Sequence, residues 1–588
     1  MFKLTKFFKK SDWLFLVLAI GLIVSQVFLE LKMPEYTKAL TEILTSPASE
    51  QSMSQVWING GYMMLCALGS MALAILTSII IAKISSSLSH NIRDELFKEV
   101  MNFSQKEINN FSIASLITRT TNDVVQIQNF FAMGLHLLLK APIMAIWAIT
   151  KITETHIEWA YAMIMVVVLI AIMVGALIFI VIPRFKKIQK LTDKLNDNMR
   201  ENISGVRVIR AFNAEEYQSE KFEKTNNQFY KNNIVTSESM SIMAPMMTLL
   251  MNGLTLAIYI IAAILINNIK VSSPSDIFQR AEIISSMAVF TSYAMQVIMS
   301  FMMLIIVFII LPRTLVSARR VNEVLASKST IVDGNGDVAT STKGTIRFEN
   351  VSFSYNNDNH YVLKNLNLDI KQGETVAFIG ATGSGKTSII NLIPRFYDAS
   401  EGNIYVDGVN VKDYKLEDLR NKISIATQKA SLFKGTIKDN VIYGDKDGFD
   451  ENRYEKALEI SHADFVNELE NKGDSEVAQG GTNYSGGQKQ RISIARAVYK
   501  KSEILIFDDT FSALDYKTDM LVRKSIKENL TDSTVLIVAQ RIGTIKNANK
   551  IVVIDQGEIV GIGKHDELLN TCPIYKEIAL SQLSQEEL

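Results

Sequence analysis

Eight residues near the middle of the chain have the pattern expected of a loop that binds phosphate groups. Residues 380–387 read Gly-Ala-Thr-Gly-Ser-Gly-Lys-Thr, which fits G-x-x-x-x-G-K-[ST] in full. An apolar run typical of a strand, 375–379, comes before them, and 388–392 predicts a helix after them. Glycines let backbone N–H groups converge on phosphate oxygens, and the helix N-terminus adds positive potential. We therefore expect Lys386 to contact the β- and γ-phosphates and Thr387 to ligate magnesium.

A carboxylate at the end of a later strand is placed to complete a metal site beside this loop. Residues 504–508 read Ile-Leu-Ile-Phe-Asp and predict a buried strand that ends in Asp508. In a parallel sheet such a carboxylate lies at the same edge as the phosphate loop. The pattern is common when it stands alone, because buried strands often end in an acid. Downstream of a phosphate loop it predicts a magnesium ligand.

Six other segments are apolar enough to cross a membrane, which needs about 20 mostly apolar residues. They cover residues 13–31, 57–84, 131–149, 159–182, 243–266 and 283–311. The third segment contains Lys140, and a charge inside a bilayer is costly, so we expect this lysine to face a partner helix or an aqueous cavity. The first segment follows a basic N-terminus without an obvious cleavage site, so we expect it to be retained as a span.

The distribution of charge gives the orientation of these spans. The loops after spans two and four are long and rich in Lys and Arg, and positive charge marks the cytoplasmic side. We therefore expect both termini in the cytoplasm and a multi-pass protein in the plasma membrane of a bacterium. The long loops keep a helical period, for example Leu191, Leu195 and Met199, so we expect the span helices to continue into the cytoplasm.

The sequence predicts two domains of different class. Residues 1–325 form the six-helix membrane domain, 326–344 a polar linker, and 345–588 an α/β domain in which strands and helices alternate. The chain has 61 basic and 61 acidic residues. This charge balance and the six spans together exclude a soluble P-loop ATPase that acts on nucleic acid.

A third motif makes the assignment specific. Residues 484–491 read Tyr-Ser-Gly-Gly-Gln-Lys-Gln-Arg and precede a predicted helix. The Ser-Gly-Gly-Gln core resembles the signature of ATP-binding cassette (ABC) proteins, with Tyr484 where Leu is more usual. In that family two cassettes clamp two ATP molecules, and each signature binds the γ-phosphate held by the opposite phosphate loop. Residues 115–123 and 205–213 resemble the intracellular loops of exporters, so the chain resembles an ABC exporter half-transporter over nearly its whole length.

This resemblance assigns further roles. Tyr355 matches the aromatic residue that stacks on adenine, and Gln428 matches the glutamine that touches magnesium. Magnesium ligands are then Thr387, Gln428 and Asp508. The residues expected to bind ATP are Tyr355, Gly380, Thr382, Gly383, Ser384, Gly385, Lys386, Thr387, Ser388, Ser485, Gly486, Gly487 and Gln488.

Two catalytic positions depart from the family pattern. After Asp508 the family usually has Glu, the general base that orients the attacking water, and this chain has Asp509. After the next strand the family usually has His, and this chain has Gln540. Aspartate is one methylene shorter, and a misplaced base forfeits most of the roughly 10²–10⁴-fold that general-base catalysis contributes. Glutamine carries no positive charge to stabilise the transferring phosphoryl group. These two departures predict a site that binds ATP and hydrolyses it poorly. Gln428, which matches the family pattern, is the third residue expected at the catalytic centre.

A degenerate catalytic site at the phosphate loop, together with an intact signature motif, implies that a second chain completes the transporter. The arrangement resembles multidrug-type heterodimeric exporters, in which a second half-transporter supplies the missing Glu and His. A homodimer with slow turnover is the alternative, since symmetry is common among oligomers. From another class, a non-transporting ATP-responsive sensor or regulatory scaffold would also explain poor hydrolysis.

The sequence indicates only the chemical class of the transported substrate. Many of the 24 methionines lie in spans five and six: Met246, Met247, Met251, Met287, Met295, Met299, Met302 and Met303. Methionine-rich surfaces remodel around varied apolar ligands, although methionine is also an ordinary packing or lipid-facing residue. Tyr293 and Gln296 would add polar groups on span six. We expect outward transport of amphipathic drugs, lipids or peptides, the direction following from the resemblance.

Overall fold

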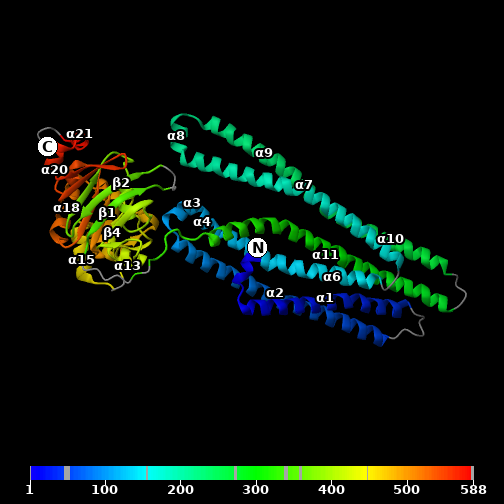
Figure 1. Ribbon diagram of the computed structural model, residues 1–588. Helices are drawn as coiled ribbons and strands as arrows, with labels where there is room; N and C mark the ends of the chain where they lie inside the picture. Colours follow the sequence, from blue (N-terminus) through cyan, green and yellow to red (C-terminus); the bar gives the residue numbers. More distant parts are fainter. Residues whose placement is uncertain are drawn as a thin grey trace. The chain divides into compact units, whose positions relative to one another are not determined.

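The computed structural model describes residues 2–45, 53–153, 157–269, 274–334, 336, 342–355, 360–445 and 448–583. It divides into two compact units, coloured along the chain in Figure 1. The membrane unit comprises residues 1–99 and 114–326, and the nucleotide-binding unit comprises 100–113 and 327–588. Part of the polar linker predicted at 326–344, namely 335 and 337–341, lies outside the described residues.

Long helices build the membrane unit. They are α1 (Lys10–Thr45), α2 (Met53–Asn102), α6 (Leu135–Thr153), α7 (Ile157–Ser204), α9 (Glu215–Ser241), α10 (Met243–Asn268) and α11 (Pro274–Ala326). Shorter elements are η1 (Phe2–Phe7), α4 (Ile113–Thr120), α5 (Asn122–Asn129), η2 (Phe130–Gly134) and α8 (Val206–Ala211). Six stretches of helix in the described chain are long and apolar enough to cross a membrane. The prediction of six spans is confirmed.

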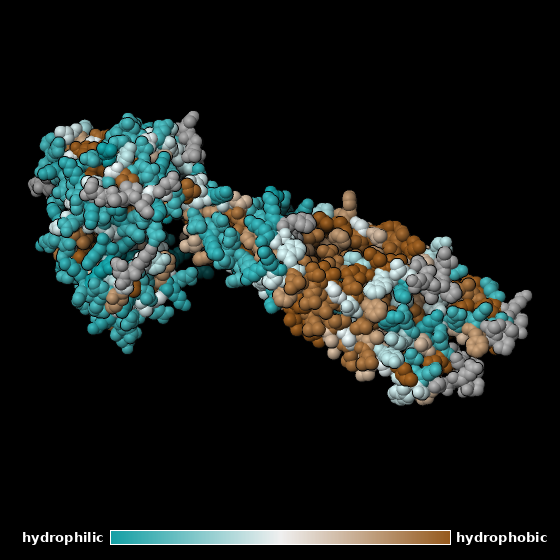
Figure 2. All heavy atoms as spheres, turned by 60° about the horizontal axis from the view of Figure 1, so that its bottom comes forward, coloured by the Kyte–Doolittle hydropathy of each residue, from teal (hydrophilic) through white to brown (hydrophobic). Residues whose placement is uncertain are grey.

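The helices exceed the length that a bilayer requires. Helix α2 has 50 residues and α11 has 53, or about 75–80 Å at 1.5 Å per residue, against a hydrocarbon core of about 30 Å. The expectation that span helices continue beyond the membrane is therefore confirmed. Figure 2 shows hydrophobic side chains covering the middle of the membrane unit on the visible face, and a mainly hydrophilic surface on the nucleotide-binding unit.

The third span begins irregularly and holds a buried charge. The π-helix η2 precedes α6, and such turns are often found at functional sites. In α6, Lys140 is only 8% exposed, and its Nζ lies 2.9 Å from Oε1 of Glu30 in α1. The expectation that Lys140 faces a partner helix is confirmed.

Two sheets organise the nucleotide-binding unit. The first is antiparallel, in the order β2 (Leu363–Ile370), β1 (Ile346–Phe353), β4 (Glu401–Val406), β5 (Val409–Asn410). The second has the order β12 (Glu558–Gly563), β11 (Lys550–Asp555), β3 (Thr375–Ile379), β10 (Thr534–Val538), β9 (Ile504–Asp508), β6 (Ile423–Ala426). Every pair in the second sheet is parallel except β11 with β12. A separate two-stranded antiparallel sheet pairs β7 (Gly435–Thr436) with β8 (Glu476–Val477).

The parallel sheet is buried on both faces, which explains its uninterrupted apolar strands. All residues of β9 and β10 are buried. One core packs against α17 (Gly486–Tyr499) and α18 (Tyr516–Asn529), and the other lies between the two sheets and α12 (Lys386–Leu392). The remaining helices are α3 (Gln105–Phe111), α13 (Leu416–Asn421), α14 (Ile437–Val441), α15 (Glu451–Ile460), α16 (Phe465–Glu468), α19 (Ile542–Ile545), α20 (His565–Thr571) and α21 (Pro573–Leu580). Parallel strands end at one edge of this sheet, and the predicted phosphate loop and Asp508 both lie there.

Candidate nucleotide site

The loop 380–385 connects β3 to α12 in a conformation that needs glycine. Gly383 and Gly385 have φ of 84° and 102°, in the left-handed region that L side chains rarely adopt. A Cβ on Gly380 would lie 2.0 Å from the carbonyl oxygen of Ile554, so backbone packs directly against backbone there. The loop leads straight into the N-terminus of α12. Its geometry therefore suits backbone N–H groups that converge on an anion.

The lysine of this loop is held inside it. Lys386 Nζ donates to the carbonyl oxygens of Gly380 at 2.8 Å and Ala381 at 2.7 Å, and to Ser384 Oγ at 3.4 Å. Burial lowers the pKa of Lys386 below its ordinary value, although the Asp509 and Asp508 carboxylates raise it. A bound phosphate would supply further negative charge and favour the protonated amine.

The expected metal ligands Thr387 and Asp508 lie in contact. Thr387 Oγ1 donates to Asp508 Oδ1 at 3.1 Å. Burial raises the pKa of the Asp508 carboxyl, the Thr387 hydrogen bond lowers it, and the Asp509 carboxylate raises it again. A cation at this point would stabilise the ionised carboxylate, and hydroxyl and carboxylate oxygens are ligands that Mg²⁺ prefers. The residues present therefore fit magnesium.

Asp509 is hydrogen-bonded to the two other residues expected to be catalytic, Gln428 and Gln540. Its Oδ2 accepts one hydrogen bond from Gln428 Nε2 at 3.1 Å and another from Gln540 Nε2 at 3.0 Å. The backbone of Asp509 is left-handed, with φ 46°, and its N–H donates to the Val538 carbonyl at 3.0 Å. Asp509 is 8% exposed, whereas both glutamines are exposed. Two exposed amides thus donate hydrogen bonds to one oxygen of a buried carboxylate.

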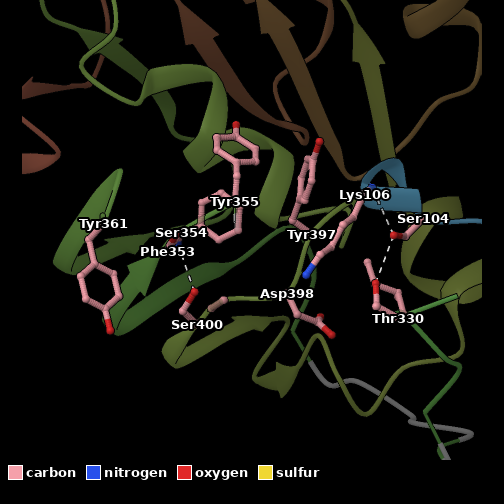
Figure 3. Close-up of a pocket in the computed structure, with 12 residues that line it drawn as sticks. Ser104, Lys106, Thr330, Phe353, Ser354, Tyr355, Tyr361, Tyr397, Asp398 and Ser400 are labelled. Carbon is pink, nitrogen blue, oxygen red and sulfur yellow. Dashed lines mark hydrogen bonds between the residues drawn. The ribbon is translucent and has the colours of Figure 1, made fainter. Parts of the chain in front are cut away.

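Aromatic and polar side chains line a pocket of about 460 Å³ in the nucleotide-binding unit. Figure 3 shows Tyr355 and Tyr397 next to each other in it, and their ring centroids are 5.0 Å apart. The Tyr355 hydroxyl lies 2.8 Å from Ser388 Oγ, which connects the aromatic residue to the first turn of α12. Tyr355 is 37% exposed, so part of its side chain is accessible to a planar base.

Residues that sequence reasoning missed also line this pocket, among them Ser104, Lys106 and Tyr397. Ser104 caps α3, and its Oγ lies 3.2 Å from Thr330 Oγ1. Asn109 of α3 donates to the Tyr397 hydroxyl at 3.3 Å. The sequence does contain a capping box, formed by Ser104 and Glu107. It does not show that Asn109 of the same helix contacts Tyr397, which lies 288 positions later.

The signature residues lie apart from this constellation. Ser485 caps α17, where its Oγ accepts from Gln488 N and the Gln488 side chain accepts from Ser485 N. Ser485 and Gly486 are exposed, and a Cβ on Gly486 would meet nothing within 4 Å. Among the described residues, no hydrogen bond joins 485–488 to the phosphate loop. Gly487 packs against the Ala513 carbonyl.

Comparison with known proteins identifies the family. The ABC transporter model matches residues 363–512, and the ABC transporter transmembrane region model matches residues 16–281. An uncharacterized ABC transporter ATP-binding protein of Mycobacterium tuberculosis is 35% identical over 475 residues, covering 80% of this chain and 79% of the relative. The chain belongs to the ABC transporter family. Its cassette is therefore an ATP-binding domain of a multi-pass membrane transporter.

Other relatives and a solved structure extend the comparison of this ABC transporter chain. An ATP-dependent lipid A-core flippase of Mannheimia succiniciproducens is 30% identical over 474 residues, covering 80% of this chain and 79% of that protein. A bacterial Atm1-family ABC exporter with ATP bound superposes with a TM-score of 0.79 at 21% identity, covering 97% and 98% of the two chains. The predicted fold class, six membrane helices joined to an α/β ABC domain, is confirmed. The chain has the architecture of an exporter half-transporter.

Proposed function

We propose that this chain is the degenerate-site subunit of a heterodimeric ABC exporter. Its own phosphate loop holds ATP with little hydrolysis, and its signature completes the active site of a second half-transporter. The partner carries the catalytic Glu and His that are replaced here by Asp509 and Gln540. The complex moves amphipathic molecules out across the bacterial plasma membrane, with both termini of this chain in the cytoplasm.

The observation that carries the proposal is the state of Asp509. A general base must present a carboxylate oxygen to the water that it orients. Both Gln428 and Gln540 donate to Oδ2 of Asp509, so that oxygen already has two hydrogen-bond donors. Its short side chain starts from a backbone that is fixed by the N–H bond to Val538. These contacts favour a side chain that organises the site over one that activates water.

Nucleotide binding does not depend on these two departures. The loop 380–387 and Tyr355 would hold the phosphates and the adenine, and Thr387, Asp508 and Gln428 would hold magnesium. Magnesium, when bound, supplies positive charge that neutralises the phosphate oxygens. The Lys386 ammonium would exchange its bonds to Gly380 and Ala381 for phosphate oxygens without leaving the loop. ATP retained in this way would hold two cassettes together.

The exposed signature supports a role in another chain. Ser485 and Gly486 are solvent-accessible, and Gly486 faces open space, so another chain's phosphates can approach. The capping box keeps this helix N-terminus ordered without a ligand. A homodimer with slow turnover and a non-transporting ATP-responsive scaffold both remain as competing proposals. Neither of them requires an active partner site.

The substrate class rests on the membrane unit and on the relatives. Met295 and Met299 in α11 and Met246 in α10 are exposed, whereas Met247 in α10 is buried, so the methionines of these spans include both accessible and packing residues. A relative named as a lipid A-core flippase supports lipids among the amphipathic drugs, lipids or peptides considered.

ATP hydrolysis by purified protein in nanodiscs tests this function. We expect negligible activity from the chain alone and robust activity after co-expression with a half-transporter encoded beside it. The reason is that only the composite site made of the partner's phosphate loop and this chain's signature contains a competent base. Robust turnover by this chain alone would contradict the proposal.

A further inference from the structure

Polar side chains from four membrane helices meet around Glu30 inside the membrane unit. Three donors converge on Glu30 Oε1: Lys140 Nζ at 2.9 Å, Gln26 Nε2 at 2.9 Å and Ser70 Oγ at 3.2 Å. From α11, Gln296 Nε2 donates to the main-chain oxygen of Glu30 at 3.3 Å. We call Gln26, Glu30, Ser70, His136, Lys140 and Gln296 the Glu30 cluster. His136 belongs to it because it lies one helical turn before Lys140 on the same face of α6.

The cluster lies within hydrophobic spans. Glu30 is in the candidate span Lys10–Leu44, and Lys140 is in Ile113–Ile152. The side chains of Glu30 and Lys140 are 15% and 10% exposed. Ionisable residues at such positions are costly, and in membrane proteins they mark sites that handle polar or charged cargo. An ion pair of this kind adds little stability over an apolar pair of similar volume.

Several buried polar atoms of the Glu30 cluster have no hydrogen-bond partner among the described residues. They are the Oε1 atoms of Gln26 and Gln296 and the Nδ1 atom of His136. Gln26 is only 4% exposed. An ammonium group has three N–H donors, and in the described part of the chain Lys140 Nζ uses one of them, on Glu30. The cluster therefore has spare acceptors on its glutamines and spare donors on its lysine.

The charges decide which ligand fits. Glu30 and Lys140 sum to zero, so a purely cationic ligand would meet Lys140 and a purely anionic ligand would meet Glu30. A zwitterion avoids both repulsions, because its anionic group can take the lysine donors and its cationic group the carboxylate and amide oxygens. Spare acceptors further favour a cation that carries N–H donors. Phosphoethanolamine, with a phosphate and a primary ammonium, meets both requirements.

We propose that the Glu30 cluster binds the zwitterionic head group of an amphipathic substrate that carries a phosphate and a primary ammonium. The proposal rests on the transport function above and narrows its substrate class. The competing explanation is a structural contact between helices, with water on the spare polar atoms. The two differ in one respect, since a structural contact gives no preference among lipid head groups.

Native mass spectrometry of the full chain in detergent tests the proposal with three lysophospholipids of the same acyl chain. Lysophosphatidylethanolamine has the ammonium donors, lysophosphatidylcholine has a methylated cation without N–H, and lysophosphatidylglycerol is anionic. We expect the ethanolamine lipid to bind about 10-fold more tightly than the other two, as one or two charge-assisted hydrogen bonds allow. Equal affinity for all three, or a preference for either control lipid, would overturn the proposal.

A double variant separates ligand binding from folding. Gln26→Leu with Gln296→Leu removes the spare acceptors and keeps the Glu30–Lys140 pair. The substitutions also remove the hydrogen bonds that the two amides donate to Glu30, so Tm is measured in parallel to show that the variant remains folded. We expect the ethanolamine preference to disappear in this variant, and its persistence would overturn the proposal. The readout is binding without ATP, so failure here leaves the proposed ATPase asymmetry to its own test.

Discussion

Ser485→Asp in this chain is expected to reduce ATP hydrolysis by the two-chain complex by about 10²-fold, a loss comparable to removing a donor that stabilises transition-state charge. Asp is as good a helix N-cap as Ser, so α17 keeps its capping interaction. Its carboxylate would, however, lie where the account places the partner's γ-phosphate. The loss is measured as kcat of the complex in nanodiscs.

Two controls make the result specific. Ser485→Thr keeps the cap and adds no charge, so this variant should retain most of the activity. Asp509→Asn removes the carboxylate of this chain's own site, and activity should fall by less than about two-fold because this site contributes little turnover. If Asp509→Asn were as damaging as Ser485→Asp, the assignment of roles to the two sites would be wrong.

Asp509→Glu combined with Gln540→His is expected to raise hydrolysis at this chain's own site by about 10²-fold, the lower end of general-base contributions. The added methylene extends the carboxylate by about 1.5 Å, and the histidine replaces an amide that now donates to Asp509 Oδ2. The measurement is ATPase activity of the complex whose partner site has been inactivated by Lys→Ala in the partner's phosphate loop.

The matched control for this gain is Asp509→Gln with Gln540→His, which has the length of the Glu variant and no base. It should remain inactive, since a glutamine side chain has the length of glutamate but no carboxylate that can accept a proton. Equal activity in the Gln and Glu variants would show that the side chain at 509 is not what limits this site.

Local patterns were sufficient for the elements that carry nucleotide chemistry. The strand at 375–379, the glycine-rich loop and the helix after it follow each other directly, so periodicity and glycine spacing predicted them together. The six spans were equally predictable, because each needs only its own apolar length. The observed helices start earlier or end later than the apolar cores, since their extensions beyond these cores are polar and give no hydropathy signal.

Contacts between distant segments could not be predicted in this way. Lys140 was expected to have a partner, but Glu30 is 110 positions away, and a single acid in the first span gave no sign of which helix it faces. The convergence of Gln428 and Gln540 on one oxygen of Asp509 depends on neighbouring β-strands that are far apart in sequence. The π-helix at Phe130–Gly134 was likewise not predicted, because no local sequence pattern specifies this helix type.

The most direct test of the account is the nucleotide that remains bound during turnover. The complex is incubated with ATP and magnesium, separated rapidly from free nucleotide, and analysed for bound ATP and ADP. We predict that close to one ATP per complex stays unhydrolysed over many turnovers, and that Lys386→Ala in this chain abolishes this retained ATP. Conversion of all bound ATP to ADP at the rate of turnover, or retention that is unaffected by Lys386→Ala, would contradict a site that binds ATP and hydrolyses it poorly.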